Sequence, residues 1–144
     1  MFGFGNKQAA AIDETDLYIR SILSGLGEEA RPLPPELFAD PYVLGFLELL
    51  TVHATATVYR YRTPKPEKLA AIMASAVDRI VPGSGNSVGK LLAELKDPAD
   101  PDHADYRRGR EDGSAHVHNL MATDEIARNQ RYHAFRAYIE ARFL

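Results

Sequence analysis

The segment PYVLGFLELLTVHATATVYRY, residues 41–61, constrains the fold more than any other part of the chain. Its second half is rich in β-branched and aromatic residues, which strands favour. It follows the first half without a turn signal, however, and no partner strand is visible elsewhere, so a strand here would leave its backbone polar groups unsatisfied. We therefore predict one helix from 41 to about 61, with Asp40 as N-cap and Pro41 in the first turn.

This predicted helix is apolar on nearly all sides, which is typical of a central helix with neighbours on several faces. Its length approaches that of a membrane span, but Glu48 and His53 lie within it and argue against a membrane helix. The rest of the chain is therefore expected to supply the neighbours.

Apolar residues at helical spacing predict these neighbours. A first helix is expected to start in the acidic cluster at 13–16 and to end at Gly27, after a flexible arm over 1–11. The remaining helices are expected over about 64–80, 86–96, 102–122 and from Thr123 or Asp124 onward, with a DP-rich turn at 97–101. The sequence thus predicts an all-α protein, a single domain over 1–144 built as a bundle of about six helices.

Size and composition fit one soluble domain. A chain of 144 residues can bury a core without help from disulfides or metals, and a net charge of −3 gives no general attraction to nucleic acid or anionic lipid. The chain has no cysteine, which excludes disulfides and thiolate chemistry. Its first residues do not resemble a signal peptide, so we expect a cytoplasmic protein.

The stretch RGREDGSAHVHN, residues 108–119, holds the densest set of residues suited to chemistry. On a helix, Asp112 and His116 share one sector, and His118 points almost directly away. The HVH pair therefore cannot chelate one ion, because positions i and i+2 do not face each other. Asp112 and His116, at i and i+4, suit a divalent metal or a carboxylate that orients an imidazole. The more common outcome of this spacing is a structural hydrogen bond.

Glu48 and His53 lie within the apolar central helix, about 140° apart on its circumference. A carboxylate inside a protein needs a partner, and an arginine of the fifth helix is the partner we expect for Glu48. In a second arrangement, Glu48 or His53 faces Asp112 and His116 and forms a carboxylate–imidazole site between two helices. The usual di-metal pattern of bundles is absent. The candidate ligand-binding residues are thus Glu48, His53, Asp112 and His116, of which Asp112 and His116 are weak metal candidates, and no cofactor is identified.

Two glycines stand one turn apart on the fifth predicted helix, Gly109 and Gly113. Each costs about 1 kcal/mol of helix propensity, which another interaction has to offset. Close approach of a second helix is the expected reason, and an open face for a ligand is the alternative.

Nucleic-acid binding is a third alternative for the function. The third and fourth predicted helices resemble a helix-turn-helix, but the Gly- and Ser-rich turn between them is several residues longer than usual. The second of these helices also has few side chains that suit bases or phosphates. The same region lacks the residues of a phosphate-binding P-loop. We regard nucleic acid as an improbable partner.

No Ser-His-Asp, Cys-His or paired-carboxylate arrangement is identifiable, so binding is favoured over catalysis. We expect a homodimer or a small-ligand-binding protein. The prediction of a homodimer rests on two features. One is the apolar circumference of the 41–61 helix, and the other is a largely aromatic stripe along the last helix, formed by Tyr132, Phe135, Ile139 and Phe143. A metal- or ligand-dependent bundle using the four candidate residues is the alternative.

Overall fold

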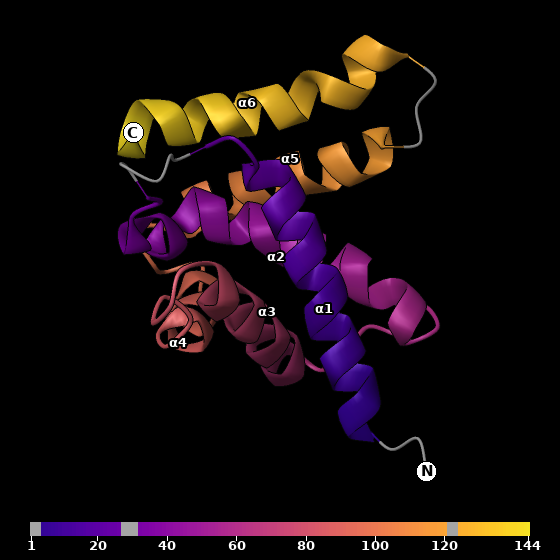
Figure 1. The fold of residues 1–144 in the computed structure, drawn as a ribbon. Coiled ribbons are helices and arrows are strands. Elements are labelled where there is room, and N and C mark those ends of the chain that lie inside the picture. The colour runs from indigo at the N-terminus through magenta and orange to yellow at the C-terminus, as the bar shows by residue number, and fades with distance from the viewer. Residues whose placement is uncertain (1–3, 27–31, 121–123) are drawn as a thin grey trace.

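A computed structural model describes residues 4–26, 32–120 and 124–144 of the chain. These residues form an all-helical, single-domain bundle, which confirms the predicted fold class (Figure 1). The elements are α1 (Phe4–Leu23), the short 3-10 helix η1 (Pro35–Ala39), α2 (Pro41–Val58), α3 (Pro66–Ile80), α4 (Val88–Leu95), α5 (His103–Asn119) and α6 (Glu125–Phe143). The DP-rich segment 97–101 lies in the turns between α4 and α5.

The helix expected over 41–61 is present as α2, and it starts as predicted. The Asp40 carboxylate accepts a hydrogen bond from the Val43 backbone N–H at 3.1 Å, and Pro41 occupies the first turn. The helix ends three residues earlier than expected. Arg60 and Tyr61 have φ angles of 51° and 63°, and this left-handed backbone, uncommon for residues other than glycine, turns the chain out of the helix.

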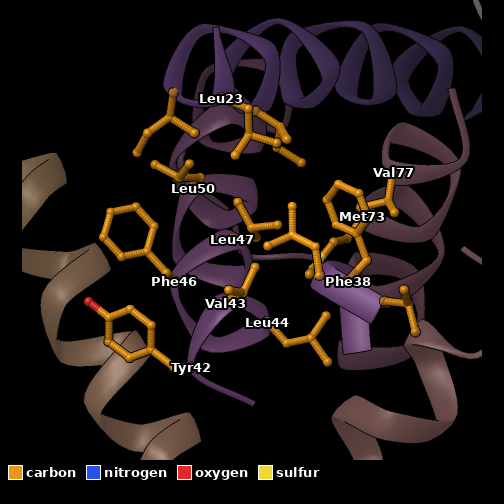
Figure 2. Packing of buried hydrophobic residues seen from close by; sticks show 14 of the residues in the cluster. Leu23, Phe38, Tyr42, Val43, Leu44, Phe46, Leu47, Leu50, Met73 and Val77 are labelled. Atoms are coloured by element: carbon orange, nitrogen blue, oxygen red, sulfur yellow. The ribbon is translucent and has the colours of Figure 1, made fainter. Parts of the chain in front are cut away.

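α2 is the central helix, and it is enclosed by the chain itself. It packs against α1, α3 and α5, and η1 lies beside its start. Tyr42 and Phe46 point to one side of α2, and Met73 and Val77 of α3 lie on the other side (Figure 2). Leu47 lies in the core between these two pairs. Hydrophobic side chains all round α2 therefore have partners within one chain.

The structure also accounts for the aromatic stripe of the last helix. Phe135 and Ile139 are fully buried in the core, and the Phe135 ring stacks on Phe46 with centroids 3.9 Å apart. Both features that led us to expect a homodimer are thus satisfied inside the monomer. The homodimer stays a prediction, which light scattering at micromolar concentration tests.

Glycines let α2 and α5 approach closely, as expected from Gly109 and Gly113. A Cβ atom at Gly109 would overlap the carbonyl oxygen of Tyr42, and a Cβ at Gly45 would overlap that of Tyr106. A Cβ at Gly113 would lie 2.9 Å from the Phe46 carbonyl oxygen. The backbone contact between the two helices offsets the poor helix propensity of glycine.

The expectation of a flexible arm over 1–11 is wrong for residues 4–11, because α1 begins at Phe4. Three alanines at 9–11 favour the helix, and Ala11 is completely buried, so packing extends the helix ahead of the acidic cluster. α1 ends at Leu23, and Gly25 follows in the left-handed region with φ 80°. Gly27, expected as the end of this helix, lies outside the described residues.

Among the described residues, α2 alone is long and apolar enough to cross a membrane by length and composition, with 61% of it buried inside the structure. The core helix of a soluble protein has the same properties, so this is weak evidence for a membrane span.

Candidate functional site

The structure divides the four candidate residues between two places. Glu48 lies beside the first half of α5, against Tyr106 and Arg110. His116 and Asp112 belong to the second half of α5, and His53 is close enough to His116 to affect its titration. The arrangement that would bring Glu48 together with Asp112 and His116 is not formed.

Glu48 is buried, with 2% of its surface exposed, and its carboxylate has partners from two directions. The Tyr106 hydroxyl donates to Oε1 at 2.6 Å, and Arg110 forms an ion pair with the same oxygen. Lys96, just after α4, places Nζ 3.4 Å from Oε2. The expected arginine of the fifth helix is therefore Arg110, and the lysine is a partner that sequence reasoning missed.

A pocket of about 400 Å³ opens beside this cluster. It lies between α2, the start of α3 and the first half of α5. Its wall has an apolar part and a charged part. The lining residues are Glu48, Val52, Thr63, Pro64, Pro66, Leu69, Lys96, His103, Tyr106, Arg107 and Arg110. We call this space the Glu48 pocket.

The Glu48 pocket is positive although the whole protein is acidic. Lys96, Arg107 and Arg110 outnumber the Glu48 carboxylate, which leaves a net charge of +2 when His103 is neutral. Arg107 also pairs with Glu111, at 3.7 Å, but both of these side chains are largely exposed and such pairs are weak. Arg107 is therefore available to an anion that enters the pocket, whereas Lys96 and Arg110 pair with Glu48.

Hydrogen bonding and burial define the polar groups of the wall. The imidazole of His103 donates from Nδ1 to the carbonyl oxygen of Leu95 at 2.7 Å, because a carbonyl only accepts, and neutral His103 keeps a lone pair on Nε2. Burial raises the pKa of Tyr106 to about 12, so its hydroxyl is a proton donor at neutral pH. Burial lowers the pKa of the Arg110 guanidinium.

His116 points inward and His118 is exposed, which confirms the geometry expected for α5. The His116 ring lies against Phe46, with centroids 5.6 Å apart, and its Nδ1 is buried without a hydrogen-bond partner. Burial, and the proximity of His53, lower the pKa of His116, so the imidazole is neutral at pH 7.

Asp112 does not orient His116. Its carboxylate accepts a hydrogen bond from the Tyr42 hydroxyl at 2.6 Å and lies 3.5 Å from the Arg131 guanidinium. Burial and this hydrogen bond raise the pKa of Tyr42. His53 lies 3.4 Å from the Tyr18 hydroxyl instead of facing the carboxylate. Asp112 thus links α2, α5 and α6.

Within the described ranges, no three His, Asp or Glu side chains stand close enough together to hold a metal ion. Comparisons with known proteins add no assignment, because no protein family, curated protein or solved structure matches the chain. The site has to be interpreted from its own chemistry. The sequence did not single out Lys96, in the turn after α4, or His103, the first residue of α5, because neither belongs to a recognisable pattern. It also did not single out Tyr106 and Arg107 as wall residues.

Proposed function

We propose that this protein binds a small organic dianion, such as a phosphate monoester, in the Glu48 pocket. The observation that carries the proposal is the net charge of +2 on a wall that also has an apolar side. A dianion would balance this charge, and a carbon body attached to it would cover Val52, Pro64 and Leu69. The proposal thus gives a ligand class to the small-ligand binding that the sequence predicts.

The wall supplies the donors that such a ligand needs. Arg107 offers a planar guanidinium, which suits paired hydrogen bonds to phosphate or carboxylate oxygens. Lys96 offers a flexible ammonium that can turn from Glu48 toward the ligand. Arg110 and Tyr106 hold the Glu48 carboxylate in place at the wall of the pocket.

Glu48 sets the affinity and the selectivity of the proposed site. It neutralises one of the three cations, which limits the positive charge in the pocket when no ligand is bound. It also repels an anion that reaches too deep. We therefore expect the anionic group to lie at the mouth of the pocket, near Arg107, and the apolar body to lie against the proline side.

Isothermal titration calorimetry with phenyl phosphate tests the proposal. We expect saturable binding that Arg107→Gln weakens about tenfold or more, a loss of about 1.4 kcal/mol. Arg108→Gln is the matched control, because Arg108 is the next residue of α5 but pairs with Asp105 and does not line the pocket. Phenol, which lacks the charge, is expected to bind more weakly.

Two results would overturn the proposal. The first is no saturable binding of phenyl phosphate up to about 10 mM, a range that covers weak binding of small ligands. The second is equal affinity in Arg107→Gln and Arg108→Gln. A location in the cytoplasm, expected from composition, accords with binding of a soluble anion and stays a prediction.

A further inference from the structure

A second pocket, of about 310 Å³, lies where the end of α5 meets the start of α6. Its lining residues are His116, Leu120, Arg128, Asn129 and Tyr132, none of which belongs to the Glu48 pocket. We call it the His116 pocket. It is separate from the proposed dianion site, because it adjoins the opposite end of α5.

His116 is an unusual residue for the wall of a purely structural gap. Only 7% of it is exposed, and its Nδ1 has no hydrogen-bond partner. An unsatisfied buried nitrogen costs about 1–3 kcal/mol, whereas an apolar side chain of similar size would pack on Phe46 without that cost. Packing alone therefore does not account for an imidazole at this position.

The ring presents one nitrogen to the pocket. Nδ1 is sealed inside the protein, so Nε2 is the ring nitrogen that a ligand can reach. The neutral form places its hydrogen on Nε2, because an orphaned N–H is avoided more strongly in proteins than an orphaned acceptor. His116 thus offers the pocket an uncharged N–H donor on a rigid aromatic floor.

The other lining residues define the rest of the ligand. Arg128 is exposed and has no acidic partner among the described residues, so its guanidinium can pair with an oxyanion. Leu120 and the Tyr132 ring supply apolar walls. One cation without a buried carboxylate corresponds to a single negative charge, in contrast to the charge of +2 in the Glu48 pocket.

We infer that the His116 pocket is a second ligand site, which binds a small monocarboxylic acid with a flat apolar body. The carboxylate pairs with Arg128 and accepts from Nε2 of His116. The apolar body lies between Leu120 and Tyr132. Benzoate is the simplest molecule with these properties and serves as the probe.

Nuclear magnetic resonance of the histidine ring signals tests this inference on the full-length protein. We expect benzoate to shift the His116 signals in a saturable way and to leave the exposed His118 unchanged. Arg128→Gln should weaken this binding about tenfold or more, and because Arg128 is exposed, the variant is expected to fold. Arg108→Gln is the control and should leave the titration as it is, because Arg108 lines neither pocket.

Three outcomes would each overturn the inference. One is no shift of His116 at benzoate concentrations up to about 10 mM. Another is a shift that Arg128→Gln does not weaken. The third is equal binding of benzyl alcohol, the uncharged counterpart, which would remove the carboxylate from the assignment. None of these results depends on the binding of phenyl phosphate, so the two sites are judged separately.

Discussion

A buried titratable side chain lies near each end of α5, and the surroundings of the two side chains are opposite in character. Near its start, the Glu48 carboxylate of α2 is surrounded by a tyrosine hydroxyl and two cations. Near its end, His116 is packed on an aromatic ring and has no partner for Nδ1. A carboxylate can be kept in the interior as an ion when donors reach it, whereas an imidazole without partners loses its proton.

The surroundings explain the difference. Lys96 and Arg110 are partly exposed, so their long side chains bring charge from the surface to Glu48. His116 lies over Phe46, which itself stacks on Phe135 of α6, so apolar groups occupy the space where a donor or acceptor would stand. One pocket therefore has several charges and the other has a single cation. Variants at each end of α5 measure how much the contacts there contribute to the free energy of unfolding.

Removal of Glu48 is expected to have the largest effect. Glu48→Ala leaves Arg110 and Lys96 without their buried partner and should lower the free energy of unfolding by about 3 kcal/mol, as breaking a buried ion pair does. Glu111→Ala is the control, because it removes an exposed partner of Arg107 and should cost less than about 0.5 kcal/mol. Urea unfolding of both variants measures the difference, and similar losses would show that burial of Glu48 is unimportant.

A methyl group at Gly109 should disturb both ends of α5 together. Gly109→Ala forces the helix away from the Tyr42 carbonyl, with an expected loss of about 1–3 kcal/mol. Gly89→Ala in α4 is the matched control. No atom lies within 4 Å of a Cβ there, so this change should raise stability by about 0.5–1 kcal/mol. Thermal unfolding distinguishes opposite signs, and a loss in both variants would contradict the packing argument.

The pH dependence of stability isolates the His116 end. Its pKa is lowered in the fold from the usual 6.5, so the unfolded chain takes up the proton first as the pH falls. Stability from this group is therefore fully present above about pH 6.5 and declines below it. His116→Leu should flatten that decline and raise stability at pH 7 by about 1–3 kcal/mol, because it removes the buried Nδ1 that has no hydrogen-bond partner.

Urea unfolding at several pH values between neutral and mildly acidic compares this variant with His118→Gln. His118 is exposed, so its replacement should leave the acid decline of the native protein in place. An unchanged decline in His116→Leu would show that another group is responsible.

The smallest effect is expected at the Tyr42–Asp112 hydrogen bond, between the two ends. Tyr42→Phe removes the donor to a half-buried carboxylate that keeps Arg131 nearby, and should cost about 1 kcal/mol. Tyr61→Phe, at a residue 82% exposed, should change nothing measurable. Equal unfolding midpoints for the two variants would mean that the hydrogen bond does not stabilise the fold.

The central helix, its N-cap and the inward turn of His116 could all be predicted from local pattern. Each depends on a short-range rule, namely the spacing of apolar residues, the Asp-Pro start or the 100° turn per residue. The partner of Glu48 was predicted only by residue type and helix. The start of α1 was predicted too late, although three alanines at 9–11 favour a helix, because the burial of Ala11 depends on how the helix packs against the rest of the fold.

By itself the sequence determined the helices, the central place of α2 and the side of α5 that faces inward, because neighbouring residues settle periodicity and capping. The tertiary structure alone decided that Lys96 and His103 line the same pocket as Glu48. It also decided that Asp112 accepts a hydrogen bond from Tyr42 and that His116 lines a second pocket. These pairings depend on how closely α2 and α5 approach through their glycines and on where the α4–α5 turn places its side chains. Such distances are properties of packing between segments far apart in the chain.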